Sequence, residues 1–476
     1  TRLTAGRTPL PAGLARLRLR AGGEGGAMLH GATVRAPAPS AERAPSTAAG
    51  PSTEPPAAVE AGSPGSIILY SIDTLRADVL ELYGGPVPTP ALRRFAAGAV
   101  IFDGAVSQSS WTKASMASVL TGLAPPVHGA LSRRHVLAPE RVTLQEMLSA
   151  AGYQTAAFNT NPNLTRAFGF DQGFDFFVDL PETATAGDVL EEVRAWLARD
   201  RDPSRPLFLW VHTLDPHSPY APPEAARERW AAGVDPRVAA DSRYYLDGMR
   251  AGRIPRDEGI LDDLRRLYQA EAAYSDEVFG RFLDLFEAND LGDAALLVLS
   301  DHGEEFYEHG NLEHGRSLFE ESVHVPMLLR LPGLEPARVE PRVQHLDVMP
   351  TLLEWAGVEV PRALPGRSLL EVAAGAGGPN RVMWSHLHLD GAERAALYGP
   401  LLKLTAERRP DGRLGRFLLF DLDDDPGELR DLSAERPLER GWLAHELRRS
   451  LAIRQEAAEI DLDSETRRRL EALGYL

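Results

Sequence analysis

The sequence predicts an α/β protein with a central, mostly parallel β-sheet flanked by helices and a smaller C-terminal α+β subdomain. Short apolar runs bounded by turn residues alternate with helical patterns through most of the chain, as expected for parallel strands buried on both faces. Polar side chains directly follow several of these runs. Because ligands gather at the carboxyl ends of parallel strands, we expect these side chains to share one site.

The expected elements follow these patterns along the chain. The predicted strands of the sheet are 66–73, 100–102, 153–158, 207–212, 296–300 and 325–331. The predicted helices are 89–99, 115–120, 143–151, 183–200, 261–288 and 347–356. From about residue 366 the pattern changes to short antiparallel strands at 382–387, 401–404 and 416–421, followed by helices from 438 and 464.

Three parts are expected: a leader over 1–64, a main domain over 65–370 and a C-terminal subdomain over 371–476. The leader is rich in Ala, Pro, Gly, Ser and Arg without apolar periodicity, which favours a disordered tether. Its first twenty residues contain arginines but no acidic residue, as some targeting segments do. A plain unstructured extension explains the same composition.

Bulk composition narrows the function. The net charge of −17 over 476 residues argues against nucleic acid as a partner. An anionic substrate would then need local positive charge, most simply a metal ion. The absence of cysteine excludes disulfides and thiolate ligands, and no apolar run is long enough for a membrane span. Lysine occurs only at positions 113 and 403.

Candidate metal ligands stand at the ends of two predicted strands. Asp301 and His302 follow strand 296–300, and Asp73 ends strand 66–73. A carboxylate beside an imidazole can bind one divalent cation. Alternatively, the aspartate caps the next helix and the histidine is structural.

Thr112 lies where a loop of small residues becomes a helix. The free N–H groups at a helix start favour an anion at that place. An ordinary N-cap is the alternative interpretation of this threonine, and the two are compatible.

Several motifs in order along 66–432 resemble the sulfatase family within the alkaline phosphatase superfamily. The matching stretches are Ile-Asp-Thr-Leu-Arg-Ala-Asp78, Ser-Trp-Thr-Lys-Ala-Ser-Met-Ala-Ser-Val-Leu-Thr-Gly122, Asp-Pro-His-Ser-Pro-Tyr220, Ser-Asp-His-Gly-Glu304, His-Gly-Arg-Ser-Leu-Phe-Glu-Glu321, His-Leu-Asp-Val-Met-Pro-Thr-Leu-Leu353 and Leu-Phe-Asp-Leu-Asp-Asp-Asp-Pro-Gly-Glu428. The resemblance implies an alkaline-phosphatase-like fold with its catalytic domain over 65–370.

The resemblance also implies roles for individual residues. Asp73, Asp301 and His302 would hold one divalent metal ion (Ca, Mg, Mn or Zn) that also reaches the hydroxyl of Thr112 at the nucleophile position. Histidines and an asparagine would contact the substrate anion or the leaving group; they are His217, His314 and, by a looser match, Asn161. His128, His212, His309 and His345 are interpreted as structural histidines.

The nucleophile motif departs from true sulfatases, whose Cys or Ser is converted to formylglycine. Here the stretch is Thr112-Lys-Ala-Ser-Met116, and threonine cannot give that aldehyde. Related phosphodiesterases and phosphoethanolamine or glycerol-phosphate transferases use threonine. We therefore expect hydrolysis of a phosphate or sulfate ester through Thr112, with phosphoesters favoured. Lys113 would either stabilise the developing charge or point to solvent.

Two other functions stay open at this point. The first is a phosphotransferase of the phosphoethanolamine or glycerol-phosphate type, and the second is an inactive binding protein that kept the fold. The expected partner is an anionic ester. The family usually works outside the cytoplasm, so a periplasmic or secreted location is an expectation from the resemblance.

Overall fold

The computed structural model describes residues 5–9, 15–19, 65–375, 381–409 and 411–476. Backbone contacts divide the chain into two units, Thr1–Glu54 and Pro55–Leu476, which are described separately. In the first unit, β1 (Ala5–Pro9) pairs antiparallel with β2 (Ala15–Leu19). The predicted leader therefore contains a hairpin where the sequence favoured no regular structure. The alternating pattern Ala15-Arg-Leu-Arg-Leu19 fits a strand, and the prediction for 20–64 lies outside the described residues.

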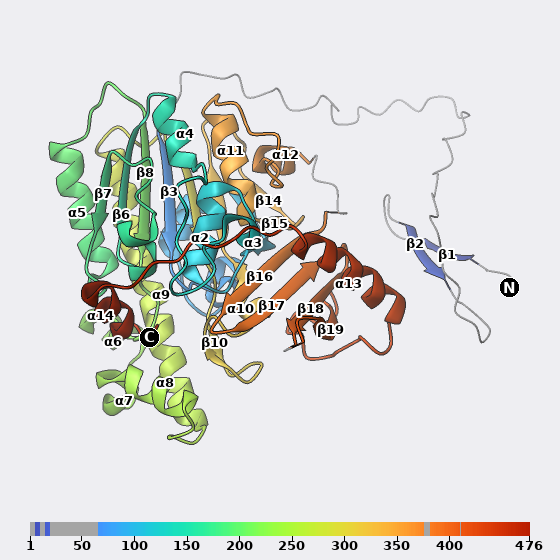
Figure 1. Cartoon of the computed structure of the whole chain (residues 1–476). Helices are drawn as coiled ribbons and strands as arrows, with labels where there is room; N and C mark the ends of the chain where they lie inside the picture. Colours follow the sequence, from blue (N-terminus) through green and yellow to red (C-terminus); the bar gives the residue numbers. More distant parts are fainter. Residues whose placement is uncertain (1–4, 10–14, 20–64, 376–380, 410) are drawn as a thin grey trace, which may run out of the picture. The chain divides into compact units, whose positions relative to one another are not determined.

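The second unit is built on an eight-stranded mixed sheet with the order β14-β4-β13-β9-β3-β8-β6-β7 (Figure 1). Strand β13 is antiparallel to both of its neighbours, whereas all the other pairings in this sheet are parallel. The strands are β3 (Ile67–Ile72), β4 (Val100–Phe102), β6 (Gln154–Asn159), β7 (Phe176–Asp179), β8 (Leu207–Thr213), β9 (Ala295–Ser300), β13 (Met327–Arg330) and β14 (Ala337–Val339).

The central strands contribute to a hydrophobic core on each face of the sheet. In β3, Ile67 and Leu69 belong to one core, while Ile68, Tyr70 and Ile72 belong to the other. This alternation follows from the two-residue period of a strand. All of these side chains are almost fully buried, so the strand reads in the sequence as a continuous apolar run.

Different helices cover the two faces. The first core includes side chains from α2 (Thr112–Thr121), α4 (Leu144–Ala150), α11 (Val348–Trp355) and α12 (Leu369–Ala373). The second includes side chains from α1 (Pro90–Ala96), α5 (Ala186–Arg199), α8 (Ser242–Arg250) and α9 (Glu258–Glu287). Helices α4 and α5 begin with capping boxes at Thr143 and Thr185, which satisfy free N–H groups of their first turns.

Shorter elements complete this part of the chain. The short helices are α3 (Pro125–His128), α6 (Glu224–Trp230), α7 (Pro236–Ala240) and α10 (Glu320–Val323). A three-stranded sheet consists of β5 (Ala105–Val106), β12 (His324–Val325) and β15 (Val343–Gln344), and a hairpin consists of β10 (Glu305–Phe306) and β11 (Leu312–Glu313). The 3₁₀ turns are Ala77–Val79, Glu81–Tyr83, Pro162–Leu164, Arg166–Phe168 and His345–Asp347.

The C-terminal part has its own antiparallel sheet and core (Figure 1). Its strands β16 (Met383–Leu389), β17 (Ala392–Tyr398), β18 (Leu402–Arg408) and β19 (Leu414–Asp421) pair in sequence order, and α13 (Pro437–Leu451) packs its Leu443 and Leu447 into the same core. The sequence analysis did not include β17. Its alanine-, glutamate- and arginine-containing sequence has little strand propensity, and pairing with both neighbours overrides that preference.

After α13 the chain returns to the main sheet. The N–H of Gln455 donates to Pro126 O at 2.9 Å, and the N–H of Ile460 donates to Arg134 O at 3.0 Å. Helix α14 (Ser464–Ala472) then buries Leu470 in the core shared with α2. The expected fold class is confirmed, and no helix of the described residues is long and apolar enough to cross a membrane.

Candidate active site

The ends of three neighbouring strands bring the predicted polar residues together. Strand β3 lies between β8 and β9, and Ile72 pairs with Thr213 on one side and with Ser300 on the other. Asp73 therefore emerges beside His212 of β8 and beside Asp301, which follows β9. The predicted convergence at the carboxyl edge of the sheet is present in the structure.

Two carboxylates and one imidazole form a buried cluster there. One ligand atom each from Asp73, His212 and Asp301 lies within 4.8 Å of the others. His212 Nε2 is 3.2 Å from Asp73 Oδ2, and Asn161 Nδ2 donates to the same oxygen at 2.5 Å. Among the described residues, Asp73 Oδ1 and Asp301 Oδ2 have no hydrogen-bond partner. Two buried acceptors without a donor are costly, and a bound cation would satisfy them.

Electrostatics indicate the same need for a cation. Burial and the charge of Asp73 raise the pKa of Asp301 to about 6. For Asp73 burial acts in the same direction, but the hydrogen bond from His212 and the nearby histidines outweigh it and lower the pKa. Such divergence is typical of two carboxylates that repel each other at close range. Carboxylate oxygens and an imidazole nitrogen are suitable ligands for a divalent ion, so the donor set fits the expected metal.

This trio differs from the predicted ligand set at one position. The sequence analysis took His212 as structural and expected His302 beside the two aspartates. His212 was recognisable as a polar residue closing a buried strand, but its place beside Asp73 depends on the strand order β9-β3-β8. The His212 ring is held from behind by Ser71, whose Oγ is 2.8 Å from Nδ1, a contact that orients Nε2 toward the cluster.

Backbone strain marks the residue next to Asp73. Thr74 has φ 52°, which is rare for a β-branched residue. Its N–H donates to Asp301 Oδ1 at 3.0 Å, and its carbonyl accepts from Tyr268 Oη at 2.7 Å. These bonds hold the strained turn, and strain of this kind is concentrated at functional sites.

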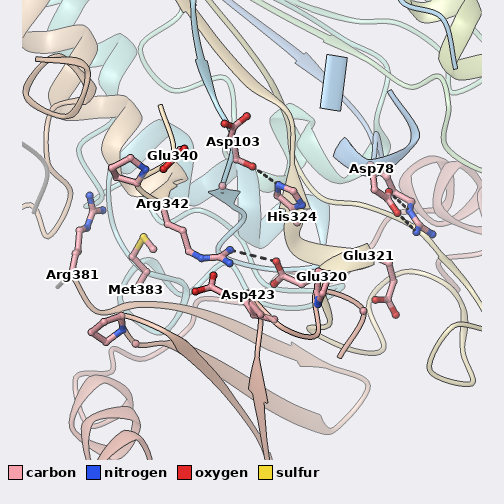
Figure 2. Close-up of a pocket in the computed structure, with 18 of the residues that line it drawn as sticks. Asp78, Asp103, Glu320, Glu321, His324, Glu340, Arg342, Arg381, Met383 and Asp423 are labelled. Carbon is pink, nitrogen blue, oxygen red and sulfur yellow. Dashed lines mark hydrogen bonds and ion pairs between the residues drawn. The ribbon is translucent and has the colours of Figure 1, made fainter. Parts of the chain in front are cut away.

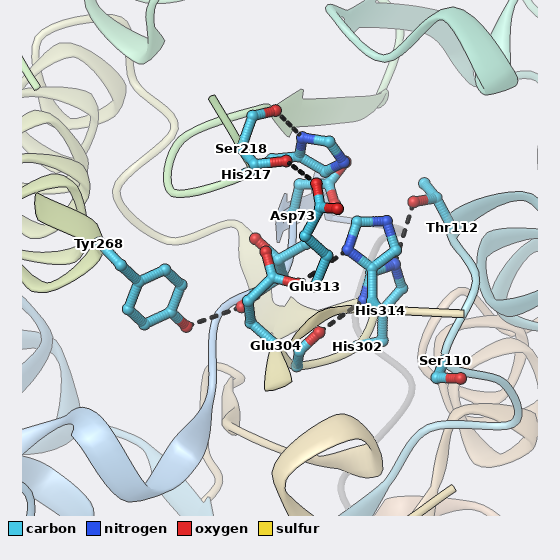
Figure 3. Close-up of polar contacts among 12 residues, drawn as sticks. Asp73, Ser110, Thr112, His217, Ser218, Tyr268, His302, Glu304, Glu313 and His314 are labelled. Carbon is cyan, nitrogen blue, oxygen red and sulfur yellow. Dashed lines mark hydrogen bonds and ion pairs between the residues drawn. The ribbon is translucent and has the colours of Figure 1, made fainter. Parts of the chain in front are cut away.

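Thr112 is the first residue of α2, and Trp111 occupies the N-cap position. No side chain caps this helix start, so the Thr112 hydroxyl is not used as a cap. Thr112 Oγ1 instead lies 3.1 Å from His302 Nε2 (Figure 3). His302 Nδ1 is 2.9 Å from Gly303 O, so that nitrogen carries the proton in the tautomer consistent with this contact. The Nε2 atom is then free to accept the hydroxyl proton.

His217 and His314 lie close to this pair (Figure 3). The ring centroid of His314 is 4.6 Å from that of His302 and 4.8 Å from that of His217. His314 Nδ1 is 2.9 Å from Glu304 Oε1. Burial first, and then neighbouring histidines, lower the pKa of His314; burial also lowers that of His217. Before a substrate binds, burial therefore favours the neutral form of both rings.

Lys113 points elsewhere. Its ammonium donates to the carbonyls of Ser132, Arg133 and His135 at 2.9–3.1 Å and lies 3.2 Å from the centre of the Phe168 ring. Adjacent residues of a helix do not face the same direction, which separates this side chain from that of Thr112. Since the ammonium is held by three carbonyls, we leave Lys113 out of the chemistry proposed below.

Away from the Asp73 cluster, a hollow of 980 Å³ lies between the main part and the C-terminal sheet (Figure 2); it is called the larger hollow below. Several of its charged groups are already paired: Arg76 with Asp78 at 2.7 Å, and His324 Nε2 with Asp103 O at 2.7 Å. Neither Thr112 nor the Asp73 cluster lines it. The hollow is therefore separate from the candidate site.

Comparison with known proteins identifies the family. A model of the sulfatase family matches residues 66–358, well over half of the chain. The chain belongs to the sulfatase family. An ulvan-active sulfatase of Formosa agariphila is 25% identical over 353 residues, which cover 64% of each chain. A choline-sulfatase of Rhizobium meliloti is 31% identical over 268 residues, covering 51% of this chain and 49% of that protein. The chain matches less than two thirds of the length of these curated relatives.

Solved structures show the same fold. A protein in complex with its substrate D-glucosamine-2-N,6-O-disulfate has a TM-score of 0.70 and 20% identity, covering 82% of this sulfatase-family chain and 97% of that chain. A phosphonate monoester hydrolase from Silicibacter pomeroyi has a TM-score of 0.63 and 21% identity, with coverages of 82% and 94%. The fold is thus shared by proteins named for sulfate and for phosphonate esters.

Two further residues of the site were not assigned a role by the sequence analysis. Glu304 contacts His314 and, through Oε2, the Tyr220 hydroxyl at 3.1 Å; its position directly after the Asp301-His302 pair was a usable signal. Tyr475 reaches the site from α14, and its hydroxyl is 2.6 Å from His217 Nε2. No local pattern in the sequence links Tyr475 to residues more than 250 positions away.

Proposed function

We propose that this sulfatase-family protein is a metal-dependent ester hydrolase that uses Thr112 as its nucleophile, with phosphate-type esters preferred over sulfate esters. The observation that carries the proposal is the 3.1 Å contact between Thr112 Oγ1 and His302 Nε2 at the start of α2. The preference follows from chemistry, because threonine cannot become formylglycine. The names of the sulfate and phosphonate ester relatives are compatible with either group.

The residues divide the work as follows. Asp73, His212 and Asp301 would hold a divalent ion, with His302 beside them, and this ion would supply positive charge that favours the alkoxide form of a nearby hydroxyl. Thr112 Oγ1 attacks the phosphorus or sulfur atom, and its proton passes to His302 Nε2. The bond to the leaving oxygen breaks, and a water molecule later cleaves the ester on Thr112.

His217 and His314 are candidates for protonating the leaving oxygen. Burial favours the neutral form of both rings before a substrate binds, but a bound anionic ester raises the pKa of a neighbouring imidazole. One of the two rings would then be protonated in the complex. Asn161 Nδ2 would donate to an oxygen of the substrate anion as it does to Asp73.

The test compares wild type with Thr112→Ala and Thr112→Ser on 4-nitrophenyl phosphate, bis(4-nitrophenyl) phosphate and 4-nitrophenyl sulfate. We expect Thr112→Ala to lower kcat/KM by about 10³-fold or more, Thr112→Ser to keep part of the activity, and a phosphoester to be the best substrate. Thr121→Ala, at the other end of α2, is the matched control.

A second measurement looks for the intermediate. Acid-quenched wild type should show the added mass of the phosphoryl or sulfuryl group on the peptide containing Thr112. Full activity of Thr112→Ala would contradict the proposal, as would an esterase activity insensitive to chelation. Elemental analysis of the purified protein would identify the metal, and export stays a prediction from the family resemblance.

A further inference from the structure

The segment 463–476, called here the closing segment, covers the candidate active site. It consists of α14, capped by Asp463, and the four residues Leu473–Leu476. Figure 1 shows the chain running back from α13 toward the main sheet before it forms α14. Arg469 fixes the helix by binding Glu182 at 2.9 Å and Leu180 O at 2.7 Å.

The turn after α14 directs Tyr475 inward. Gly474 ends the helix with φ +71°, its N–H donates to Glu471 O, and the N–H of Tyr475 donates to Leu470 O at 2.8 Å. A Cβ at position 474 would lie 1.1 Å from an Arg243 nitrogen, and another Arg243 nitrogen donates to Leu473 O at 3.1 Å. Arg243 and the glycine turn therefore hold Tyr475 in place.

The Tyr475 side chain occupies the space next to the nucleophile. Its hydroxyl is 2.6 Å from His217 Nε2 and 3.3 Å from Asn161 Nδ2. Its ring packs edge-on against Trp111, with 4.9 Å between the centroids. His217 Nδ1 donates to Ser218 O, so Nε2 accepts the phenolic proton while Asn161 donates to the phenolic oxygen. Two of the residues proposed to contact the substrate are thus engaged by this one side chain.

The remaining space at this place is small. Thr112 and Asn161 are fully buried, and His217 is 3% exposed. The hollow at the mouth, bounded by Trp111, His314 and residues 473–475, measures only about 30 Å³, room for roughly two water molecules. With Tyr475 in place, His217 and Asn161 are engaged and little room is left at this mouth for a phosphate or sulfate ester.

We propose that Tyr475 is an internal competitor that occupies the leaving-group position, so that the closing segment must move out before an ester binds. A phenolic oxygen held by His217 and Asn161, with its ring against Trp111, has the chemistry of the leaving group of an aryl ester. The inference rests on the proposed function for the ester that displaces Tyr475. Arg133, Arg250 and Arg316 line the mouth, where Arg133 pairs with Asp390 and Arg250 pairs with Glu313, so charges of both signs face it.

The first test measures binding without turnover. Tyr475→Phe removes the hydrogen bonds and Tyr475→Ala removes the ring, so both should raise the fraction of protein with an open site and lower the apparent Kd accordingly. We expect inorganic phosphate or sulfate to bind roughly 2–10-fold more tightly to Tyr475→Phe and more tightly still to Tyr475→Ala. Tyr244→Phe, an exposed tyrosine on α8, is the control and should bind as wild type does.

The second test uses unaltered protein, so that a folding defect in a variant does not decide the result. Saturating phosphate or sulfate should increase hydrogen exchange of amides in 464–476 while exchange in α13 stays constant. Weaker or unchanged anion binding in both Tyr475 variants would overturn the inference, as would unchanged exchange in the closing segment.

Kinetics separate this inference from the proposed function. Tyr475→Phe should lower KM for 4-nitrophenyl phosphate with kcat little changed, and KM for an alkyl phosphate should fall by the same factor because both esters need the open site. If no ester is hydrolysed but anion binding tightens, the proposed function fails and the competition stands. If Thr112→Ala abolishes hydrolysis but Tyr475→Phe raises KM, the function stands and Tyr475 is a substrate-binding residue instead.

Discussion

Two buried clusters of charge in this molecule differ in whether the chain supplies the cation. At the edge of the main sheet, Asp73 and Asp301 approach each other and His212, and an oxygen of each aspartate has no partner among the described residues. Between α10 and the C-terminal sheet, Lys403 Nζ lies 2.9 Å from Glu320 and 3.0 Å from Glu428. Both clusters contain two buried carboxylates, but only the second has a lysine between them.

The Lys403 cluster is a closed structural unit. Tyr398 adds a hydrogen bond to Glu320 at 2.7 Å, and the N–H of Glu320 donates to Glu428 at 2.6 Å. Burial alone would lower the pKa of Lys403, but the two glutamates outweigh it and raise the pKa. The Lys403 cluster, which contains its own cation, therefore joins two parts of the fold. The Asp73 cluster at the strand ends is called uncompleted here because the described part of the chain supplies no cation there, which leaves its carboxylates free to bind a metal ion.

The largest expected effect comes from removing a carboxylate from the uncompleted cluster. Asp73→Asn should abolish tight binding of Mg, Mn, Ca or Zn and lower kcat/KM by at least about 10⁴-fold, because groups that act as one catalytic unit fail together. The metal-free variant should unfold at a lower denaturant concentration than metal-free wild type, because the histidines that lower the pKa of Asp73 stabilise its ionised form in the folded state. Calorimetric titration and denaturation measure these effects.

Asp423→Asn is the matched control for this variant. Asp423 is an exposed aspartate on the rim of the larger hollow, so its replacement should alter neither metal affinity nor hydrolysis. Wild-type metal affinity in Asp73→Asn would show that the uncompleted cluster is not the metal site.

The next largest effect is a loss of stability when the buried lysine is removed. Lys403→Met leaves the buried Glu428 without a cation and leaves Glu320 with only Arg342, 3.5 Å away, which should lower the free energy of unfolding by about 3–5 kcal/mol. Metal affinity should not change, because Asp73 and Asp301 are in another part of the molecule. The double variant Lys403→Met with Glu428→Gln should recover part of the loss. A single variant within about 1 kcal/mol of wild type would refute the structural role of this cluster.

Much of the fold, and several residues of the candidate site, could be predicted from local sequence. Apolar runs followed by polar residues located the strand ends with Asp73, Asp301 and His302, because strand burial leaves a direct trace in the sequence. His212 was missed because assigning it required knowing that β8 lies beside β3. Lys113 was predicted to stabilise charge at the nucleophile, but its ammonium binds carbonyls of the loop Ser132–His135, whose position the local sequence does not reveal.

Contacts between distant segments explain the other differences. Tyr475 contacts His217 and Asn161 across 258 and 314 positions, and only the path of the chain after α13 brings them together. The helix-like composition of β17 is overridden by its two neighbouring strands. In both cases the deciding interaction is tertiary, so residue patterns within one segment carry no record of it.

The smallest expected effect concerns a carboxylate whose cations lie near the surface. Glu393 accepts from Arg408 Nε at 2.5 Å, from His386 Nε2 at 3.1 Å and from Arg454. Burial alone would raise its pKa, but these hydrogen bonds outweigh burial and lower the pKa below the ordinary 4.5. Its contribution to stability is therefore complete above pH 4.5 and is lost as the pH falls further, because the unfolded chain binds the proton first.

Urea unfolding between pH 7 and pH 3.5 measures this loss. Wild type should lose about 1 kcal/mol more than Glu393→Gln over that interval, a modest value because water partly screens Arg408 and Arg454. The glutamine variant keeps the side-chain shape but cannot titrate, so it isolates the carboxylate. Equal acid sensitivity of the two proteins would show that arginines near the surface do not stabilise Glu393 as the buried Lys403 stabilises its glutamates. The contrast between clusters with and without a cation would then hold only for the Asp73 and Lys403 clusters.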